Sequence, residues 1–171
     1  MGIRSLAASA LFCAISAGMP ALAADEPTLL GSFKDWHVYS AGMGANRTCF
    51  AVSAPKEMNP KGANRSAVFF MITSWPDRKV RNEPSVVPGY PYKDMSTTVV
   101  QVGADKFDFA ITKGDGAWME APTDEQKLIA AMKKGAAMSV TGTSARGTLT
   151  RDNYSLNGIS AALDKLDVEC K

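Results

Sequence analysis

The chain has 171 residues, 46% of them hydrophobic, and a formal net charge of +2. This length suffices for one domain with a proper hydrophobic core. The near-neutral charge argues against a nucleic-acid-binding protein, which would carry a strong basic excess.

The N-terminal segment has the pattern of a cleavable secretory signal. A short basic start from Met1 to Arg4 precedes an apolar run from Leu6 to Met19, and Ala21-Leu22-Ala23 has the small-x-small form that signal peptidase accepts. The apolar run is shorter than the ~20 residues that a stable membrane anchor needs. We therefore expect residues 1–23 to be a signal peptide. Residues 24–171 are then one domain, periplasmic or secreted and without a membrane anchor.

Cleavage would remove Cys13 and leave two cysteines, Cys49 and Cys170. In an oxidising compartment two remaining cysteines most simply form one disulfide. The bond would close a loop of 170 − 49 = 121 residues, which contributes roughly 4–5 kcal/mol in the chain-entropy model. A metal site needs more ligands than two cysteines and the lone His37, so we expect neither a metal nor another cofactor.

Extended segments dominate the chain. The clearest are "AVFFMITS" at residues 67–74, which is apolar on both faces as a central strand should be, and residues 106–112, where Phe107, Phe109 and Ile111 point to one side. The other expected strands lie within 29–41, 48–53, 82–87, 97–102, 117–120, 137–143 and 147–156. About nine strands predict a mainly β protein, an antiparallel sandwich or barrel.

Two short helices interrupt this pattern. In "PTDEQKLIAAMKKG", Thr123 and Gln126 have the spacing of a capping box and Gly135 is the expected C-cap. Its apolar stripe is Leu128, Ile129 and Met132. A closing helix from about Gly158 to Leu166 has apolar residues spaced i, i+3, i+4 and i+7: Ile159, Ala162, Leu163 and Leu166. A helix this short needs packing, and a disulfide at Cys170 would help to hold it.

Catalytic motifs are missing from the sequence. His37 stands two residues from Asp35 in a predicted strand, but no G-x-S-x-G or other marked nucleophile accompanies it. No H-E-x-x-H or cysteine-histidine cluster indicates zinc. The glycine pairs at 42–44 and 114–116 fit hairpin turns better than phosphate loops, because neither opens a helix after a strand. We therefore expect a protein that is not an enzyme.

Two polar stretches are candidate recognition surfaces. Arginine and tyrosine are enriched in binding hot spots, and both stretches contain them, the first between residues 77 and 93 and the second between residues 143 and 155. The candidate binding residues are Arg78, Arg81, Glu83, Tyr90, Tyr92, Arg146 and Arg151. The competing interpretations are a solvated edge with ordinary salt bridges for the first stretch and an exposed hairpin for the second.

Several segments together are distinctive in sequence and order: "GSFKDWHVY", "CFAVSAP", "VRNEPSVVPGYPYK", "GDGAWM", "AMKKGAAMSVTGTSARGTLTRDNYSLNGISAALDKL" and the terminal Cys170. In these segments the chain resembles the invasion-associated locus B family of exported bacterial proteins. The resemblance implies a small β-rich periplasmic or surface-associated protein of an alphaproteobacterium. It carries over no catalytic residues, although the founding member is linked to entry into red blood cells. Some members have further cysteines near the first strand, where this chain has Ser40.

These observations leave competing functions. The first is a non-enzymatic periplasmic or envelope-associated binding protein, whose partner is an unknown envelope or host macromolecule and for which the family name suggests host-cell interaction. The second is an envelope hydrolase with an unfamiliar site, and the third is a structural or assembly role. A deep cleft with convergent polar groups would favour an enzyme or small-ligand binder, and a flat arginine-aromatic patch would favour a macromolecular partner.

Overall fold

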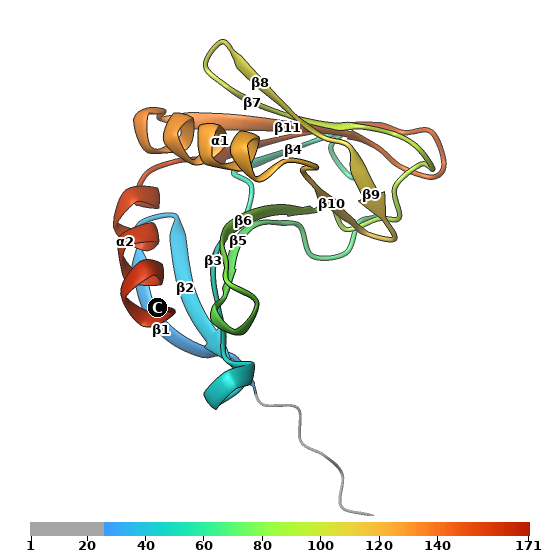
Figure 1. The fold of residues 1–171 in the computed structure, drawn as a ribbon. Helices are drawn as coiled ribbons and strands as arrows, with labels where there is room; N and C mark the ends of the chain where they lie inside the picture. Colours follow the sequence, from blue (N-terminus) through green and yellow to red (C-terminus); the bar gives the residue numbers. More distant parts are fainter. Residues whose placement is uncertain (1–25) are drawn as a thin grey trace, which may run out of the picture.

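The computed structural model describes residues 26–171, which form two antiparallel β-sheets and two α-helices (Figure 1). The expected signal peptide and its cleavage site lie outside the described residues. No helix within residues 26–171 is both long and apolar enough to span a membrane.

The larger sheet has seven strands in the order β1-β2-β3-β5-β6-β10-β9. They are β1 (Thr28–Phe33), β2 (Trp36–Ala41), β3 (Thr48–Ser53), β5 (Phe69–Trp75), β6 (Val80–Val87), β10 (Gly116–Trp118) and β9 (Ile111–Lys113). The apolar "AVFFMITS" stretch forms most of β5, which is the middle strand of the seven, as its pattern predicts.

The smaller sheet has five strands in the order β4-β12-β11-β7-β8. They are β4 (Glu57–Asn59), β12 (Leu149–Ser155), β11 (Ala137–Thr143), β7 (Thr98–Val102) and β8 (Asp105–Phe109). Neither sheet closes on itself, so the sandwich alternative is confirmed and the barrel alternative is wrong.

Two expected strands are each divided in the structure. Residues 29–41 form the β1–β2 hairpin, because Lys34 takes a left-handed conformation (φ 55°) and reverses the chain. Residues 106–112 pass from the smaller sheet to the larger at Ala110. Phe109 is buried but Ile111 is 45% exposed, because the chain changes sheets between them, so the prediction that they point to one side of a single strand is wrong.

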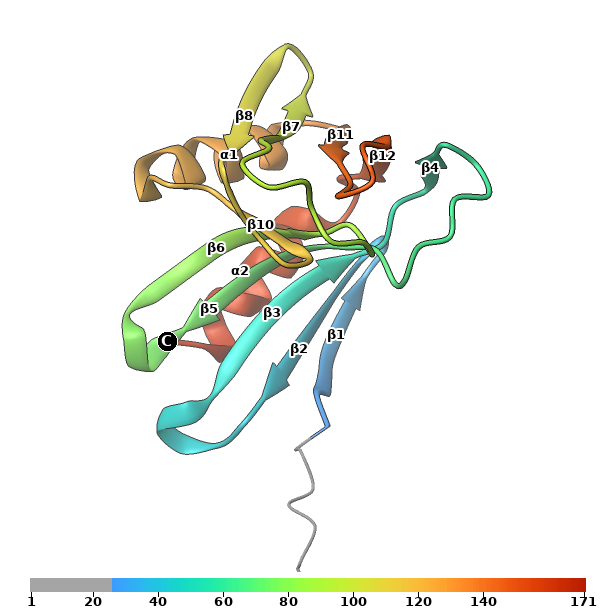
Figure 2. The same ribbon diagram turned by 90° about the vertical axis from the view of Figure 1, so that its right-hand side faces the viewer.

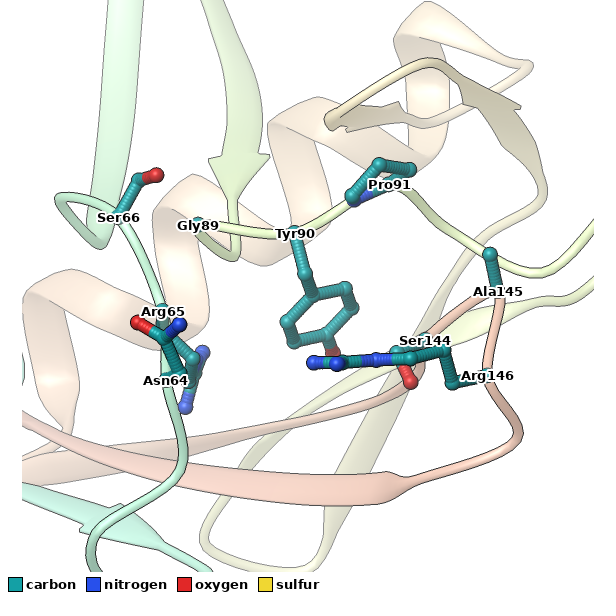
Figure 3. Close-up of a pocket in the computed structure, with 9 residues that line it drawn as sticks. All are labelled: Asn64, Arg65, Ser66, Gly89, Tyr90, Pro91, Ser144, Ala145 and Arg146. Atoms are coloured by element: carbon teal, nitrogen blue, oxygen red, sulfur yellow. The ribbon is translucent and has the colours of Figure 1, made fainter.

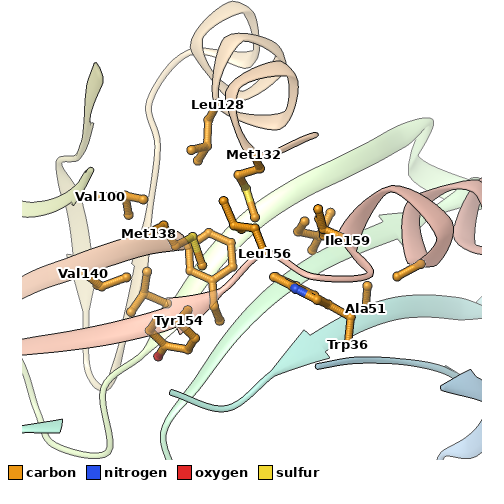
Figure 4. Packing of buried hydrophobic residues seen from close by; sticks show 14 of the residues in the cluster. Trp36, Ala51, Val100, Leu128, Met132, Met138, Val140, Tyr154, Leu156 and Ile159 are labelled. Carbon is orange, nitrogen blue, oxygen red and sulfur yellow. The ribbon is translucent and has the colours of Figure 1, made fainter. Parts of the chain in front are cut away.

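Both sheets contribute to one hydrophobic cluster, together with the two helices (Figure 4). Phe70 on β5 makes edge-on contacts with the rings of Trp36 and Tyr154. The indole Nε1 of Trp36 donates a hydrogen bond to the carbonyl oxygen of Ser155 at 3.1 Å, which satisfies its polar atom inside this cluster. These contacts join the larger sheet to the smaller one.

Helix α1 (Pro122–Lys134) begins differently from the prediction. Ala121 is the N-cap and no side chain caps the helix. Pro122 takes the first helical position, which its fixed φ favours, so Thr123 lies inside the helix and the capping box is wrong. The C-cap at Gly135 is confirmed, and Leu128 and Met132 of the predicted stripe are buried.

Helix α2 (Ile159–Glu169) lies against one face of the larger sheet, as predicted. Its buried residues are Ile159, Ala162, Leu163 and Leu166. The expected disulfide joins Cys170 to Cys49 on β3, with a Cα–Cα distance of 6.0 Å. Gly158 precedes the helix at φ 95°, and a Cβ atom there would collide with the carbonyl oxygen of Phe33. Only glycine therefore allows α2 to approach the β1–β2 turn this closely.

Candidate binding cleft

A cleft of about 360 Å³ opens where three connecting segments meet (Figure 3). One wall is the segment 64–66 that leads into β5, another is 89–91 after β6, and the third is 144–146 in the β11–β12 turn. An adjoining cavity of about 260 Å³ shares Arg65, Tyr90, Ser144 and Arg146. This cleft contains two of the predicted binding residues, Tyr90 and Arg146.

A buried ion pair forms the base of the cleft. Arg65 donates to both carboxylate oxygens of Asp152, at 2.7 and 2.6 Å, and its Nε donates to the carbonyl oxygen of Pro88 at 2.8 Å. Their side chains are only 5% and 3% exposed. Burial lowers the pKa of Arg65, but the hydrogen bonds and charge of Asp152 outweigh this effect and raise the pKa above its ordinary value. Arg65 therefore stays charged and rigidly held.

Tyr90 is fixed against this pair. The guanidinium of Arg65 lies over the Tyr90 ring, 5.1 Å from its centroid, and the hydroxyl of Tyr90 shares a 2.6 Å hydrogen bond with Thr150. Its ring also meets Tyr92 edge-on at 5.6 Å. Burial raises the pKa of both tyrosines, so both hydroxyls stay neutral. Tyr90, which is only 7% exposed, is thus a fixed part of the cleft base rather than a mobile side chain.

Backbone hydrogen bonds hold the walls together. The amide of Ser66 donates to the carbonyl oxygen of Gly89 at 2.9 Å, and that of Ala145 donates to the carbonyl oxygen of Pro91 at 2.8 Å. Gly89 has φ 74°, and a Cβ atom there would strike the backbone of Ser66. Glycine is therefore required for the first two walls to approach each other.

Arg146 supplies the exposed charge of the cleft. It extends from the wall opposite Arg65 (Figure 3), and none of the ion pairs among residues 26–171 includes it. Because Asp152 already neutralises Arg65, the unbalanced charge at the mouth is that of Arg146. The arrangement can hold an anionic group at Arg146 while an apolar part lies on the exposed Pro91 and reaches the small exposed part of Tyr90.

The structure separates the other predicted binding residues. Arg81 and Glu83 line a groove of about 460 Å³ between β6 and α1, with Glu125 opposite. Because β6 is extended at ~3.3 Å per residue, Arg81 and Tyr90 lie near opposite ends of this strand. The expectation that residues 77–93 form one surface is therefore wrong. Burial raises the pKa of Glu83, and burial together with the charge of Glu83 raises the pKa of Glu125.

Three of the predicted residues lie elsewhere. Tyr92 is only 5% exposed and belongs to the core, so it is not part of an exposed surface. Arg78 is exposed beside Asp77, and its guanidinium lies 5.8 Å from the ring centroid of Trp75. Arg151 is exposed on β12 and its Nη2 donates to the hydroxyl of Ser139 at 3.3 Å.

Sequence reasoning did not identify Arg65 and Asp152, the residues that organise the cleft. A signal for Asp152 was present: it alternates with Thr150 and Tyr154 on β12, so it must face inward and requires a partner. Nothing local marks Arg65, which lies 87 residues away in a polar loop. His37, by contrast, is half-buried, and its Nδ1 lies 2.9 Å from the Ser32 hydroxyl. Within residues 26–171, no group of three or more histidine, cysteine or acidic residues could hold a metal ion.

Comparisons with known proteins identify the family. The family model described as "Invasion associated locus B (IalB) protein" matches residues 36–167. The chain belongs to this family. The fold also matches the crystal structure of invasion-associated protein B from Bartonella henselae, with a TM-score of 0.56 and 17% sequence identity, over 81% of this chain and 95% of that one. At this identity the match to the Bartonella protein shows the fold alone. No curated protein matches the chain.

Proposed function

We propose that this IalB-family protein is an exported, non-enzymatic binding protein of the bacterial envelope. It works in the periplasm or outside the cell, and the cleft around Tyr90 and Arg146 takes an anionic group of an envelope or host macromolecule. Host-cell interaction, which the family name suggests, would be one use of this binding activity. The observation that carries the proposal is the rigid cleft base with the unpaired charge of Arg146 at its mouth.

Export is supported by the two ends of the chain. The first 23 residues have the pattern of a secretory signal. The Cys49–Cys170 disulfide fits an oxidising compartment, where such bonds form and persist. If export is correct, thiol labelling of the mature protein under denaturing, non-reducing conditions should detect no free cysteine. Two free thiols would contradict it.

Binding rather than catalysis is supported by the chemistry of the cleft. The basic and acidic groups at its base, Arg65 and Asp152, are paired with each other and buried, so neither is available to exchange protons with a substrate. Arg146 is a guanidinium, which keeps its proton and does not act as a base. The hydroxyl of Ser144 accepts a hydrogen bond from the amide of Thr148 at 3.1 Å, and no base is among the residues that line the cleft with it. What remains is recognition through the charge of Arg146, the apolar surface of Pro91 and the side-chain amide of Asn64.

The test is to titrate the mature protein with glucuronate, glucose 6-phosphate and glucose while amide shifts are recorded by NMR. The two anionic sugars should shift residues around the cleft, and the neutral sugar should not. Arg146→Ala should weaken this response several-fold, because it removes the unpaired charge. Lys106→Ala, an exposed lysine on β8 outside the cleft, is the matched control and should leave the response unchanged.

Two results would contradict the proposal. Equal responses to glucose and to its anionic relatives would remove the role of charge, and an unchanged response in Arg146→Ala would place recognition elsewhere. Hydrolysis of glucose 6-phosphate to glucose and phosphate during the titration would indicate the hydrolase alternative instead. Capture of a partner from envelope extracts by the wild type but not by Arg146→Ala would extend the result to a macromolecule.

A further inference from the structure

The cleft offers a ligand one positive charge, and the shape of that charge narrows the class of anion that it can hold. The cationic side chains that line the cleft and its adjoining cavity are Arg65 and Arg146, and Asp152 already neutralises Arg65. The guanidinium of Arg146 is planar, and its parallel N–H groups match the two oxygens of a carboxylate. A ligand with a single carboxylate therefore fits both the charge and the geometry of Arg146.

The surroundings of Arg146 do not add a helix end to this charge. Phosphate sites in proteins usually gather several N–H donors, from a helix N-terminus or from successive backbone amides. Neither α1 nor α2 supplies a residue to the cleft. In Figure 2, α1 lies at the upper left and α2 lies behind the larger sheet, while the β4–β5 connection that forms the first wall lies at the right.

The backbone amides of the walls are already used within the chain. The amides of Ser66 and Ala145 hold the walls together, as described above. In the β11–β12 turn, the amide of Gly147 donates to the carbonyl oxygen of Ser144 at 2.8 Å, and that of Thr148 donates to the Ser144 hydroxyl at 3.1 Å. A phosphate has three terminal oxygens and would find one guanidinium. A carboxylate finds an N–H donor for each of its two oxygens.

The remaining polar groups of the cleft are neutral and suit hydroxyl groups. The side-chain amide of the exposed Asn64 can donate and accept, and it lies on the wall opposite Arg146 (Figure 3). The hydroxyl of Ser144 accepts from the backbone, which leaves its own hydrogen to donate. The exposed Thr148 places a further hydroxyl in the adjoining cavity. Sugar hydroxyls also donate and accept, so they match each of these groups.

The apolar parts and the size of the cleft suit a single sugar ring. Pro91 and Ala145 are exposed along its edge and present C–H groups, against which the C–H face of a sugar ring can lie. The volume of about 360 Å³ is near the lower end of the roughly 300–1,000 Å³ that is typical of ligand pockets. One sugar unit therefore fits better than a larger ligand.

We propose that the anionic group held by this cleft is the carboxylate of an acidic sugar of the uronic acid type. Arg146 binds the carboxylate, Asn64 and Ser144 bind ring hydroxyls, and Pro91 contacts the C–H face. The inference rests on the proposed function, because it names the ligand class of the same site.

The experiment measures dissociation constants by NMR titration of the mature, disulfide-bonded protein at pH 7. Glucuronate and glucose 6-phosphate share a ring and differ at the sixth carbon, and cyclohexanecarboxylate keeps the ring and the carboxylate but has no hydroxyl. Glucuronate should bind several-fold more tightly than either compound, and glucose should bind far more weakly still.

Two variants assign these preferences to side chains. Arg146→Lys keeps the charge but replaces the planar fork by a point donor, so it should narrow the preference for glucuronate over glucose 6-phosphate. Asn64→Ala removes hydroxyl recognition, so it should narrow the preference for glucuronate over cyclohexanecarboxylate. Both residues are exposed, and circular dichroism checks that the variants are folded. Lys106→Ala on β8 is again the control and should leave both preferences unchanged.

Two results would overturn the inference and leave the proposed function in place. Glucose 6-phosphate that binds as tightly as glucuronate would remove the preference for a carboxylate, and cyclohexanecarboxylate that binds as tightly would remove the sugar. Glucose that binds as tightly as glucuronate, or no response to any of the four compounds, would overturn the inference together with the proposed function. These comparisons use the wild type alone, so they do not depend on the folding of a variant.

Discussion

Replacing Asp152 by asparagine should destabilise the fold strongly, because it leaves the charge of Arg65 buried without a counter-ion. Both side chains are at least 95% buried and joined by two short hydrogen bonds. Asp152 raises the pKa of Arg65 in the wild type, and without it burial lowers that pKa. A guanidinium is so strong a base that Arg65 nevertheless keeps its proton and cannot relieve the penalty by losing it. Asparagine keeps the size of the side chain and one acceptor, so the change mainly removes the charge.

The loss of stability in Asp152→Asn can be estimated in two ways. Breaking a buried ion pair by removing one partner costs about 3–5 kcal/mol. Coulomb's law gives about 4 kcal/mol for unit charges roughly 4 Å apart at an effective dielectric constant of 20. We therefore expect Asp152→Asn to lower the free energy of unfolding by about 3–5 kcal/mol. Urea denaturation of the disulfide-bonded protein, followed by circular dichroism, measures this change.

Two comparisons isolate the cause. Asp124→Asn breaks the exposed pair with Lys127, whose side chains are 50% and 70% exposed, and should cost less than about 1 kcal/mol. The double variant Arg65→Met, Asp152→Leu replaces the pair by apolar groups and should recover most of the loss. If Asp152→Asn costs no more than Asp124→Asn, the pair does not hold the cleft base. A double variant as unstable as Asp152→Asn would attribute the loss to packing instead.

Two further predictions concern the helices. Leu163→Ala should lower the free energy of unfolding by about 2–5 kcal/mol, because Leu163 is fully buried on the face of α2 that packs on the larger sheet. Deletion of residues 158–171 should prevent stable folding. An unchanged melting temperature after this deletion would contradict it. Glu125→Gln should raise the melting temperature at pH 7. Burial raises the folded-state pKa of Glu125 above its ordinary 4.5, so the stabilisation from its protonated form is present below about pH 4.5 and is lost as the pH rises through the folded pKa. The gain over wild type should therefore disappear near pH 4.

The strands and helices in which apolar residues recur over a long stretch were predictable from the sequence. The continuous apolar run of β5 identified the central strand, the i, i+3, i+4, i+7 spacing identified the buried face of α2, and the cysteine count identified the disulfide. Shorter elements were not. β4 has only three residues, too few for a period to show, and the chain reversal at Lys34 uses a left-handed conformation that lysine rarely adopts.

The candidate cleft was predictable only in part. Tyr90 and Arg146 were singled out by residue type, but residue type could not show that they meet. Their neighbourhood depends on how β6 leads into the Gly89 turn and how the β11–β12 turn folds back onto Pro91. The grouping of Arg81 with Tyr90 was wrong because proximity in sequence is not proximity in space along an extended strand. The pairing of Arg65 with Asp152 could be recognised only from the tertiary structure.

The pattern of β5 also bears on the face of the larger sheet that is turned away from α2. A strand that is apolar on both faces is expected to be buried on both faces. The described chain covers only the face of Phe70 and Ile72, with α2 and the smaller sheet, while Phe69 and Met71 point to the open side. Solvent-facing positions of an antiparallel sheet usually carry polar residues, as Arg151 and Asn153 do on β12. Phe69 and Met71 depart from this rule, but both are half-buried, so neighbouring side chains on the same face shield much of their apolar surface from water.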